Sequence, residues 1–190
     1  MGHLTELDRV LKSIFEEDRI GDLLMVDGGY DFDLGMEIAL LWLDKLCEHL
    51  SQPKGGRGIL QSVKTVFRSE SLILLYKKDH RAVDVIFSDI SVSDELLGIL
   101  CGPNGFYQKL ANIRFTRCFE KDAAELASLP PGYPRVHGAI AVPIFLHGVP
   151  SGCLAMLGTC PGQNFGTSHA MVLSLAASIL SVANAFDELR

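Results

Sequence analysis

The 190-residue sequence lacks any long apolar run. Its longest, residues 38–43 (Ile-Ala-Leu-Leu-Trp-Leu), is far shorter than the ~20 residues that a membrane-spanning helix needs. The chain also lacks a surplus of basic charge, since 17 Lys and Arg stand against 23 Asp and Glu, for a net charge of −6. The opening residues show no apolar segment of the kind found in secretory signal peptides. We therefore expect no membrane anchor and no direct binding to nucleic acid.

Cysteine and metal-ligand patterns are equally sparse. The five cysteines are an odd number and form no Cys-x-x-Cys motif, a usage typical of reduced thiols, so we expect a cytoplasmic protein. No His-x-x-x-His motif or Cys/His cluster predicts a metal site. The aspartates at positions 22, 27, 31 and 33 meet the spacing of a calcium-binding EF-hand loop only in part. We interpret them as part of a solvated acidic linker.

The first third of the chain is predicted to be helical. Apolar residues at helical spacing indicate a helix over 5–24, and the Gly- and Asp-rich stretch that follows indicates a linker. This pattern divides the chain into an N-terminal helix with its linker (1–33) and a main domain (34–190). Within the main domain, helices are predicted over about 34–51 and again after Pro53-Lys54-Gly55-Gly56. The second of these should bury one apolar side (Ile59, Leu60, Val63, Val66 and Phe67).

The helix over 34–51 carries apolar residues on more than one side. One stripe should face the core (Met36, Ala39, Leu40, Leu43, Leu46, Cys47 and Leu50), and a second should face outward (Ile38, Leu41 and Trp42). Leu173 and Leu180 also lie off the main stripe of the final helix. Because large apolar side chains are seldom left in water, this pattern predicts a homodimer held by helices. The alternative is that the N-terminal helix covers the second stripe within one chain.

The remainder of the chain predicts a sheet built from hairpins. The apolar run 72–76 indicates a central strand, and 82–87 its returning partner. A helix over 94–100, a half-buried strand over 113–119, and a short helix with an irregular loop over 120–135 follow. A second hairpin joins 138–145 to 153–157 around His147-Gly148, and a final helix starts at Thr167 or Ser168 and reaches Leu189. This order predicts an α+β domain with an antiparallel sheet.

From residue 34 to 190 the sequence resembles a GAF domain. The matching features are a strand that contains Pro143, the turn glycine Gly148, a return strand of small residues from Gly152, and Phe165 before an Ala-rich final helix. The resemblance implies a central antiparallel sheet with the N- and C-terminal helices on one face. A roof of helices and loops, residues 88–137, would cover a pocket on the other face. It further implies a sensory or regulatory domain that binds a small molecule and signals through dimeric helices to an effector.

The chemistry of particular GAF relatives can be compared with this sequence. The Asn-Lys pair of cyclic-nucleotide-binding relatives is missing, and no cysteine adjoins a histidine as in relatives that carry a bilin. Cys101 and Cys118 fall in the region where similar enzymes that reduce free methionine sulfoxide hold their thiols. We therefore expect a sensor that is not an enzyme. The alternatives are a thiol enzyme of that kind and a domain that binds nothing and only dimerises.

The candidate ligand-binding residues lie in the predicted roof. Tyr133, Arg135 and His137 alternate on the way into a central strand, and together they would offer an aromatic wall, a cation and a titratable donor. Such a set suits a small anionic or aromatic ligand. The competing interpretation is that Arg135 forms a structural ion pair with Asp122 or Glu125. Three further residues could line the pocket or belong to an ordinary core: Phe115, Cys118 and Phe119.

Overall fold

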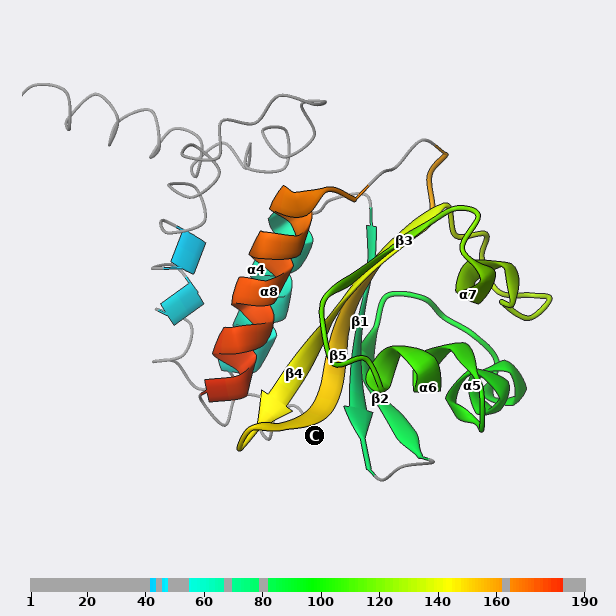
Figure 1. Cartoon of the computed structure of the whole chain (residues 1–190), viewed down its shortest axis with the longest axis horizontal. Coiled ribbons are helices and arrows are strands. Elements are labelled where there is room, and N and C mark those ends of the chain that lie inside the picture. Colours follow the sequence, from blue (N-terminus) through cyan, green and yellow to red (C-terminus); the bar gives the residue numbers. More distant parts are fainter. Residues whose placement is uncertain are drawn as a thin grey trace, which may run out of the picture.

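The computed structural model describes residues 42–43, 46–47, 55–66, 70–78, 82–161 and 165–182 (Figure 1). The elements in chain order are α4 (Gly55–Val66), β1 (Glu70–Lys77), β2 (Val83–Ser88), α5 (Asp94–Cys101), α6 (Phe106–Ala111), β3 (Arg117–Glu120), α7 (Ala124–Ala127), β4 (Gly138–Leu146), β5 (Val149–Gly158) and α8 (Thr167–Val182). Residues 42–43 and 46–47 are also helical. The predicted N-terminal helix over 5–24 and the linker up to residue 33 lie outside the described residues.

The five strands form one open sheet in the order β2-β1-β5-β4-β3, and every neighbouring pair is antiparallel. The predicted hairpins β1–β2 and β4–β5 are both confirmed. The second turns through His147 and Gly148, whose φ angles are +51° and +77°. Left-handed conformations at both turn positions match the twist of a two-residue hairpin, and the glycine adopts its angle without steric cost.

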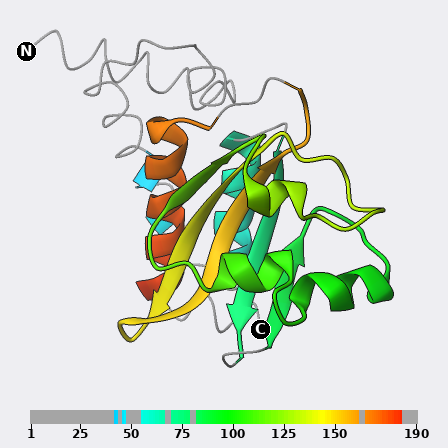
Figure 2. The ribbon, with the colours of Figure 1, turned by 45° about the vertical axis from the view of Figure 1, so that its right-hand side comes forward.

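Helices cover both faces of the sheet, as the resemblance to a GAF domain implied. Helices α4 and α8 lie side by side on one face, and α5, α6 and α7 lie on the other (Figures 1 and 2). Strand β1 shows how one segment serves both layers. Leu72 and Leu74 pack into the helix-side core, while the alternating residues Ile73 and Leu75 pack into the roof-side core. This accounts for the continuous apolar run in the sequence, because a strand covered on both faces has no polar side.

Two local predictions in the roof were wrong. Residues 106–111 form the helix α6, which the sequence analysis did not identify, and the strand predicted over 113–119 is confined to 117–120. The backbone N–H of Ile113 donates to the carbonyl of Leu110, and that of Asn112 donates to the carbonyl of Lys109. These bonds turn the chain back on α6, so residues 112 and 113 are not available for strand pairing. Strand β3 therefore begins only where the chain reaches β4.

Three of the residues predicted to face outward lie in the core instead: Trp42, Leu173 and Leu180. Trp42 is 2% exposed and packs with Leu46 in the helix-side core, although the sequence analysis placed the two on opposite faces. Residues four apart on a helix lie on nearly the same side, so a partner that covers Leu46 also covers Trp42. Leu173 and Leu180 are fully buried as well, because α8 packs against both the sheet and α4. Ile38 and Leu41 lie outside the described residues.

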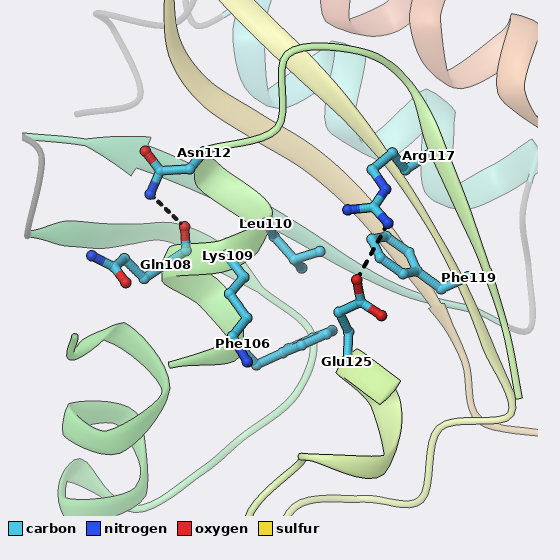
Figure 3. Close-up of a pocket in the computed structure, with 8 residues that line it drawn as sticks. All are labelled: Phe106, Gln108, Lys109, Leu110, Asn112, Arg117, Phe119 and Glu125. Atoms are coloured by element: carbon cyan, nitrogen blue, oxygen red, sulfur yellow. Dashed lines mark hydrogen bonds and ion pairs between the residues drawn. The ribbon is translucent and has the colours of Figure 1, made fainter. Parts of the chain in front are cut away.

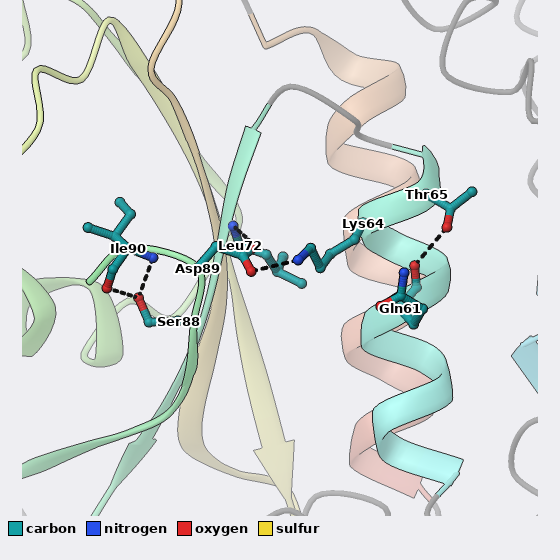
Figure 4. A network of polar contacts seen from close by, with 7 residues as sticks. All are labelled: Gln61, Lys64, Thr65, Leu72, Ser88, Asp89 and Ile90. Atoms are coloured by element: carbon teal, nitrogen blue, oxygen red, sulfur yellow. Dashed lines mark hydrogen bonds and ion pairs between the residues drawn. The ribbon is translucent and has the colours of Figure 1, made fainter.

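A set of polar contacts joins the helix layer to the chain that enters the roof (Figure 4). Lys64 on α4 donates to Asp89 Oδ1 at 2.7 Å, and the backbone N–H of Leu72 donates to Asp89 Oδ2 at 3.2 Å. The next turn is closed by Ser88, whose hydroxyl donates to the carbonyl of Ile90 and accepts from its N–H, at 2.9 and 3.0 Å. The start of the roof is thereby anchored to α4.

Candidate functional site

The sheet face under the roof is lined by small side chains. Ala139 and Ala141 of β4, with Cys153 and Ala155 of β5, are fully buried and belong to the roof-side core. Small residues on a sheet face leave room above it, and that room is filled by the large side chains of the roof. They include Tyr107, Leu110, Phe119 and Tyr133. Directly over the sheet centre, the roof is therefore a packed core.

A tyrosine pair lies at the centre of this packing. The hydroxyl oxygens of Tyr107 and Tyr133 are 3.0 Å apart, and their rings meet edge to face with centroids 6.2 Å apart. Burial raises the pKa of both phenols, and for Tyr107 the hydrogen bonds with Tyr133 and Ser88 oppose the rise. Both hydroxyls are neutral at physiological pH. The pair therefore serves packing and hydrogen bonding and offers no charge to a ligand.

A pocket of about 300 Å³ opens beside this core, between α6, β3 and α7 (Figure 3). Its lining comes from α6 and the residue that follows it (Phe106, Gln108, Lys109, Leu110 and Asn112), from β3 (Arg117 and Phe119) and from α7 (Glu125). Arg117 and Phe119 pair with Ala141 and Ala139 of β4, which belong to the roof-side core. Both therefore point to the roof side, because partners across a strand pair share a face.

Charged groups stand over an aromatic surface in the pocket. Arg117 Nη2 and Glu125 Oε1 are 3.3 Å apart, and the Arg117 guanidinium lies over the Phe119 ring at 4.9 Å from its centroid. Lys109 adds a second, exposed cation from α6. Two cations and one carboxylate thus share the lining with apolar side chains. This combination can hold a small ligand that is partly apolar and partly charged.

Helix α6 positions the pocket residues because one side of the helix is buried and the other is exposed. Phe106 and Leu110 are buried, while Lys109 faces outward. The helix starts directly after Gly105, where an added Cβ would overlap the carbonyl oxygens of Ile99 and Leu100. Only glycine brings α6 this close to the end of α5. At the other end, the Asn112 side-chain amide donates to the carbonyl of Gln108 at 2.7 Å.

Of the six residues predicted to bind a ligand, Phe119 lines this pocket. Tyr133 is buried next to it in the roof-side core, and Phe115 is 79% exposed. Arg135 is exposed and makes no ion pair within the described residues, and Glu125 pairs with Arg117 instead. His137 is half-buried, and its backbone N–H donates to the carbonyl of Gly158 at 2.8 Å.

The expected alternation of Tyr133, Arg135 and His137 is replaced by an irregular approach to β4. Tyr133 and Val136 are the buried positions. Arg135 therefore does not share the environment of Tyr133.

Three pocket residues were not predicted from the sequence: Arg117, Glu125 and Lys109. A usable signal was present for Arg117, which alternates with Phe119 in a segment already recognised as a strand. Glu125 was considered only as a partner for Arg135. Lys109 gave no signal because the helix that carries it was not recognised.

The two thiols of the alternative enzyme lie on different sides of the sheet. Cys101 packs against the roof-side core. Cys118 is exposed and pairs across the strands with Ile140, whose side chain is in the helix-side core. Partial loss of solvent around the sulfur atoms raises the pKa of both thiols, which disfavours the reactive thiolate. Within the described ranges, no three His, Cys, Asp or Glu side chains are grouped to hold a metal ion.

Comparison with known proteins shows similarity in structure only. No family model and no curated protein sequence matches the chain. Among solved structures, the GAF domain of an Acinetobacter phosphoenolpyruvate-protein phosphotransferase matches with a TM-score of 0.58 at 15% identity, covering 77% of this chain and 93% of that one. The GAF domain of the Coxiella burnetii phosphoenolpyruvate-protein phosphotransferase matches with a TM-score of 0.55 at 15% identity, covering 78% and 95%.

A third similar structure is the GAF domain of a proposed sensor histidine kinase from Pseudomonas syringae pv. tomato. Its TM-score is 0.54 at 16% identity, and the match covers 83% of this chain and 92% of that one. The chain therefore has the GAF-domain fold, and the resemblance inferred from the sequence is confirmed at the level of the fold. None of the described helices has the length and apolar character to cross a membrane.

Proposed function

We propose that the chain is a cytoplasmic sensory or regulatory domain that binds a small molecule in the roof and passes the effect to an effector through its helices. The observation that carries this proposal is the pocket itself. It lies in the roof of a GAF fold and combines cations, a carboxylate and an aromatic wall in about 300 Å³. Ligand sites of other proteins have volumes of roughly 300–1,000 Å³ and a similar mixture of apolar surface with a few polar groups. The odd number of cysteines supports a reducing compartment.

Binding without catalysis is favoured by the placement of the thiols. A reductase of the kind considered above needs two thiols that can approach each other, and the sheet lies between Cys101 and Cys118. The third thiol near the roof, Cys153, is fully buried, and burial raises its pKa. A thiol in that state is a poor nucleophile.

Transmission to the helix layer has a physical route at the β2 edge. Tyr107 of α6 contacts Ser88, and the adjacent Asp89 is held by Lys64 of α4. Helix α4 packs against α8, so a displacement of α6 by a ligand would be felt in both long helices. A ligand that binds one arrangement of these helices more tightly than another shifts the equilibrium between the two arrangements by the difference in binding free energy.

The proposed active form is a homodimer through helices. The interface of this proposed dimer does not include the Trp42 side chain, because Trp42 lies in the core. One observation favours a second candidate function, a ligand-free dimerisation domain. The roof directly above the sheet centre is filled by its own side chains, Tyr107 and Tyr133 among them.

Native mass spectrometry of the purified full chain, joined to a thermal-shift screen of small molecules, tests the proposal. We expect a dimer mass and either a copurifying small molecule or a compound that raises the melting temperature. A Lys109→Trp variant should lose that response, because the indole would cover the pocket from α6. Lys121→Trp is the matched control, since Lys121 is an exposed lysine outside the pocket.

A protein that carries and binds no small molecule would overturn the sensory proposal and favour the dimerisation domain. A monomer at tens of micromolar would overturn the dimeric route to an effector. If both lysine variants lose the response equally, the site of binding is not this pocket.

A further inference from the structure

The pocket holds two opposite charges in contact at its rim. Arg117 and Glu125 come from different elements, β3 and α7, and their side chains are 54% and 28% exposed. Their separation of 3.3 Å is longer than the roughly 2.7–2.9 Å of a strong charge-assisted hydrogen bond. Exposed pairs of this kind contribute little to stability. The pair is thus available to exchange partners without loss of the fold.

Both side chains keep unused hydrogen-bonding capacity toward the pocket. A guanidinium has five N–H donors in a planar fork, and Arg117 directs one nitrogen to Glu125. Within the described part of the chain, the second carboxylate oxygen of Glu125, Oε2, accepts no hydrogen bond and makes no ion pair. The pocket can therefore offer a donor fork and an acceptor oxygen side by side.

An apolar part of the lining adjoins the charged pair (Figure 3). Phe106 and Leu110 from α6 face Phe119 from β3, and the Phe119 ring lies directly under the Arg117 guanidinium. A ligand held by the charged pair would therefore place its own body against these three side chains. The volume of about 300 Å³ is at the lower end for ligand sites, which requires a small ligand.

We propose that this pocket binds a free α-amino acid with an apolar side chain. Its carboxylate is held by Arg117, its ammonium by Glu125, and its side chain by the apolar wall. This inference rests on the proposed sensory function and specifies the ligand class of the same site. An α-amino acid carries its two charges on one carbon, which matches two protein charges in direct contact. A peptide separates its terminal charges by the length of its backbone.

Ligands with a single charge fit the pocket less well. A simple carboxylate or a phosphate would leave Glu125 facing a like charge. A simple amine would face both Arg117 and Lys109. Like charges at this separation repel, and in a site partly shielded from water the repulsion is stronger than in bulk water.

Calorimetric titration of the full chain with L-leucine and L-phenylalanine tests the inference. Two analogues of leucine each lack one charged group: 4-methylpentanoate has no ammonium, and 3-methylbutylamine has no carboxylate. We expect both amino acids to bind and each analogue to bind at least about tenfold more weakly than leucine, which corresponds to about 1.4 kcal/mol.

Variants of the charged pair assign each half of the ligand. Arg117→Gln should weaken the binding of leucine and of 4-methylpentanoate. The binding of 3-methylbutylamine should stay unchanged or become tighter. Glu125→Gln should weaken the binding of leucine, so that leucine no longer binds more tightly than 4-methylpentanoate. Lys78→Gln is the matched control, because it breaks another exposed ion pair, Lys78 with Asp84 at 2.7 Å, outside the pocket. It should leave every affinity unchanged.

Failure of the inference differs from failure of the proposed function. If neither amino acid binds but another small molecule gives a response that Lys109→Trp abolishes, the ligand class is wrong and the sensory function stands. If nothing binds, both are overturned. Binding of leucine that tolerates loss of either charged group, or that falls equally in Lys78→Gln, also overturns the assignment of the Arg117–Glu125 pair.

Discussion

The hydroxyl pair of Tyr107 and Tyr133 supports a stability prediction that depends on which partner is removed. The Tyr133 hydroxyl has the Tyr107 hydroxyl as its one hydrogen-bond partner among the described residues, at 3.0 Å. Tyr107 also contacts Ser88. Tyr133→Phe therefore leaves the Tyr107 hydroxyl with a partner. Tyr107→Phe leaves the buried Tyr133 hydroxyl with none.

The expected losses follow from this asymmetry. A hydrogen bond between neutral groups contributes about 0.5–1.5 kcal/mol net, and we expect Tyr133→Phe to reduce the free energy of unfolding by that amount. A buried hydroxyl without a partner costs about 1–3 kcal/mol, so Tyr107→Phe should be the more damaging change. In the double variant no hydroxyl is left alone and both rings keep their edge-to-face packing. Its loss should not exceed that of Tyr107→Phe and should fall below the sum of the single losses by about 1 kcal/mol.

Urea denaturation of the four proteins measures this cycle. Trp42 is the only tryptophan and is buried in the helix-side core, so its fluorescence reports on global unfolding. The slope against urea should be the same for all four, because the buried surface is unchanged. Losses that add to within about 0.5 kcal/mol would show that the hydroxyls do not interact and would refute the reasoning. Equal losses of unfolding free energy in the two single variants would show that Ser88 does not act as a second partner of the Tyr107 hydroxyl.

Two further changes have defined outcomes. Gly105→Ala should lower the free energy of unfolding by at least about 1–3 kcal/mol, because the added Cβ meets backbone carbonyls. Gly98→Ala, in the open middle of α5, should raise the free energy of unfolding by about 0.4–1 kcal/mol. Equal effects of the two changes in chemical denaturation would contradict this prediction. Burial lowers the pKa of His169 below 6.5 in the folded protein. As the pH falls, His169 is therefore protonated in the unfolded chain before it is protonated in the folded one, and stability falls as the pH drops below 6.5. His169→Gln should make the free energy of unfolding less dependent on pH between about pH 8 and about pH 5. An unchanged pH dependence would show that another group causes it.

Much of the fold was predictable because its signals are local. The continuous apolar run at 72–76 identified a central strand without any knowledge of its neighbours, since only a strand covered on both faces has no polar side. His147-Gly148 identified the β4–β5 hairpin because a glycine-containing pair between two apolar runs is typical of a short turn, and the structure shows both residues in left-handed conformations. Together these patterns determined an antiparallel α+β domain with helices on both sides.

The pocket was not predictable in the same way, because its residues become neighbours only through packing. Arg117 and Glu125 are brought together by the path of the chain from β3 to α7 within the roof, and neither residue has a distinctive sequence context. Helix α6 is six residues long, too short for its periodicity to be recognised against its surroundings.

The sequence by itself determined the two hairpins, where they turn and the GAF-like architecture, while the pairings of β1 with β5 and of β3 with β4 came from the structure. Only the tertiary structure decided that Trp42 belongs to the core, because the helix periodicity alone did not show how wide a face α8 and the sheet would cover. It also decided that Tyr133 closes the roof while Arg117 faces the pocket. Backbone preferences and turn geometry act between near neighbours in the chain, and sequence carries them directly. The environment of a side chain depends on surfaces that meet from distant segments, and folding is what brings those surfaces together.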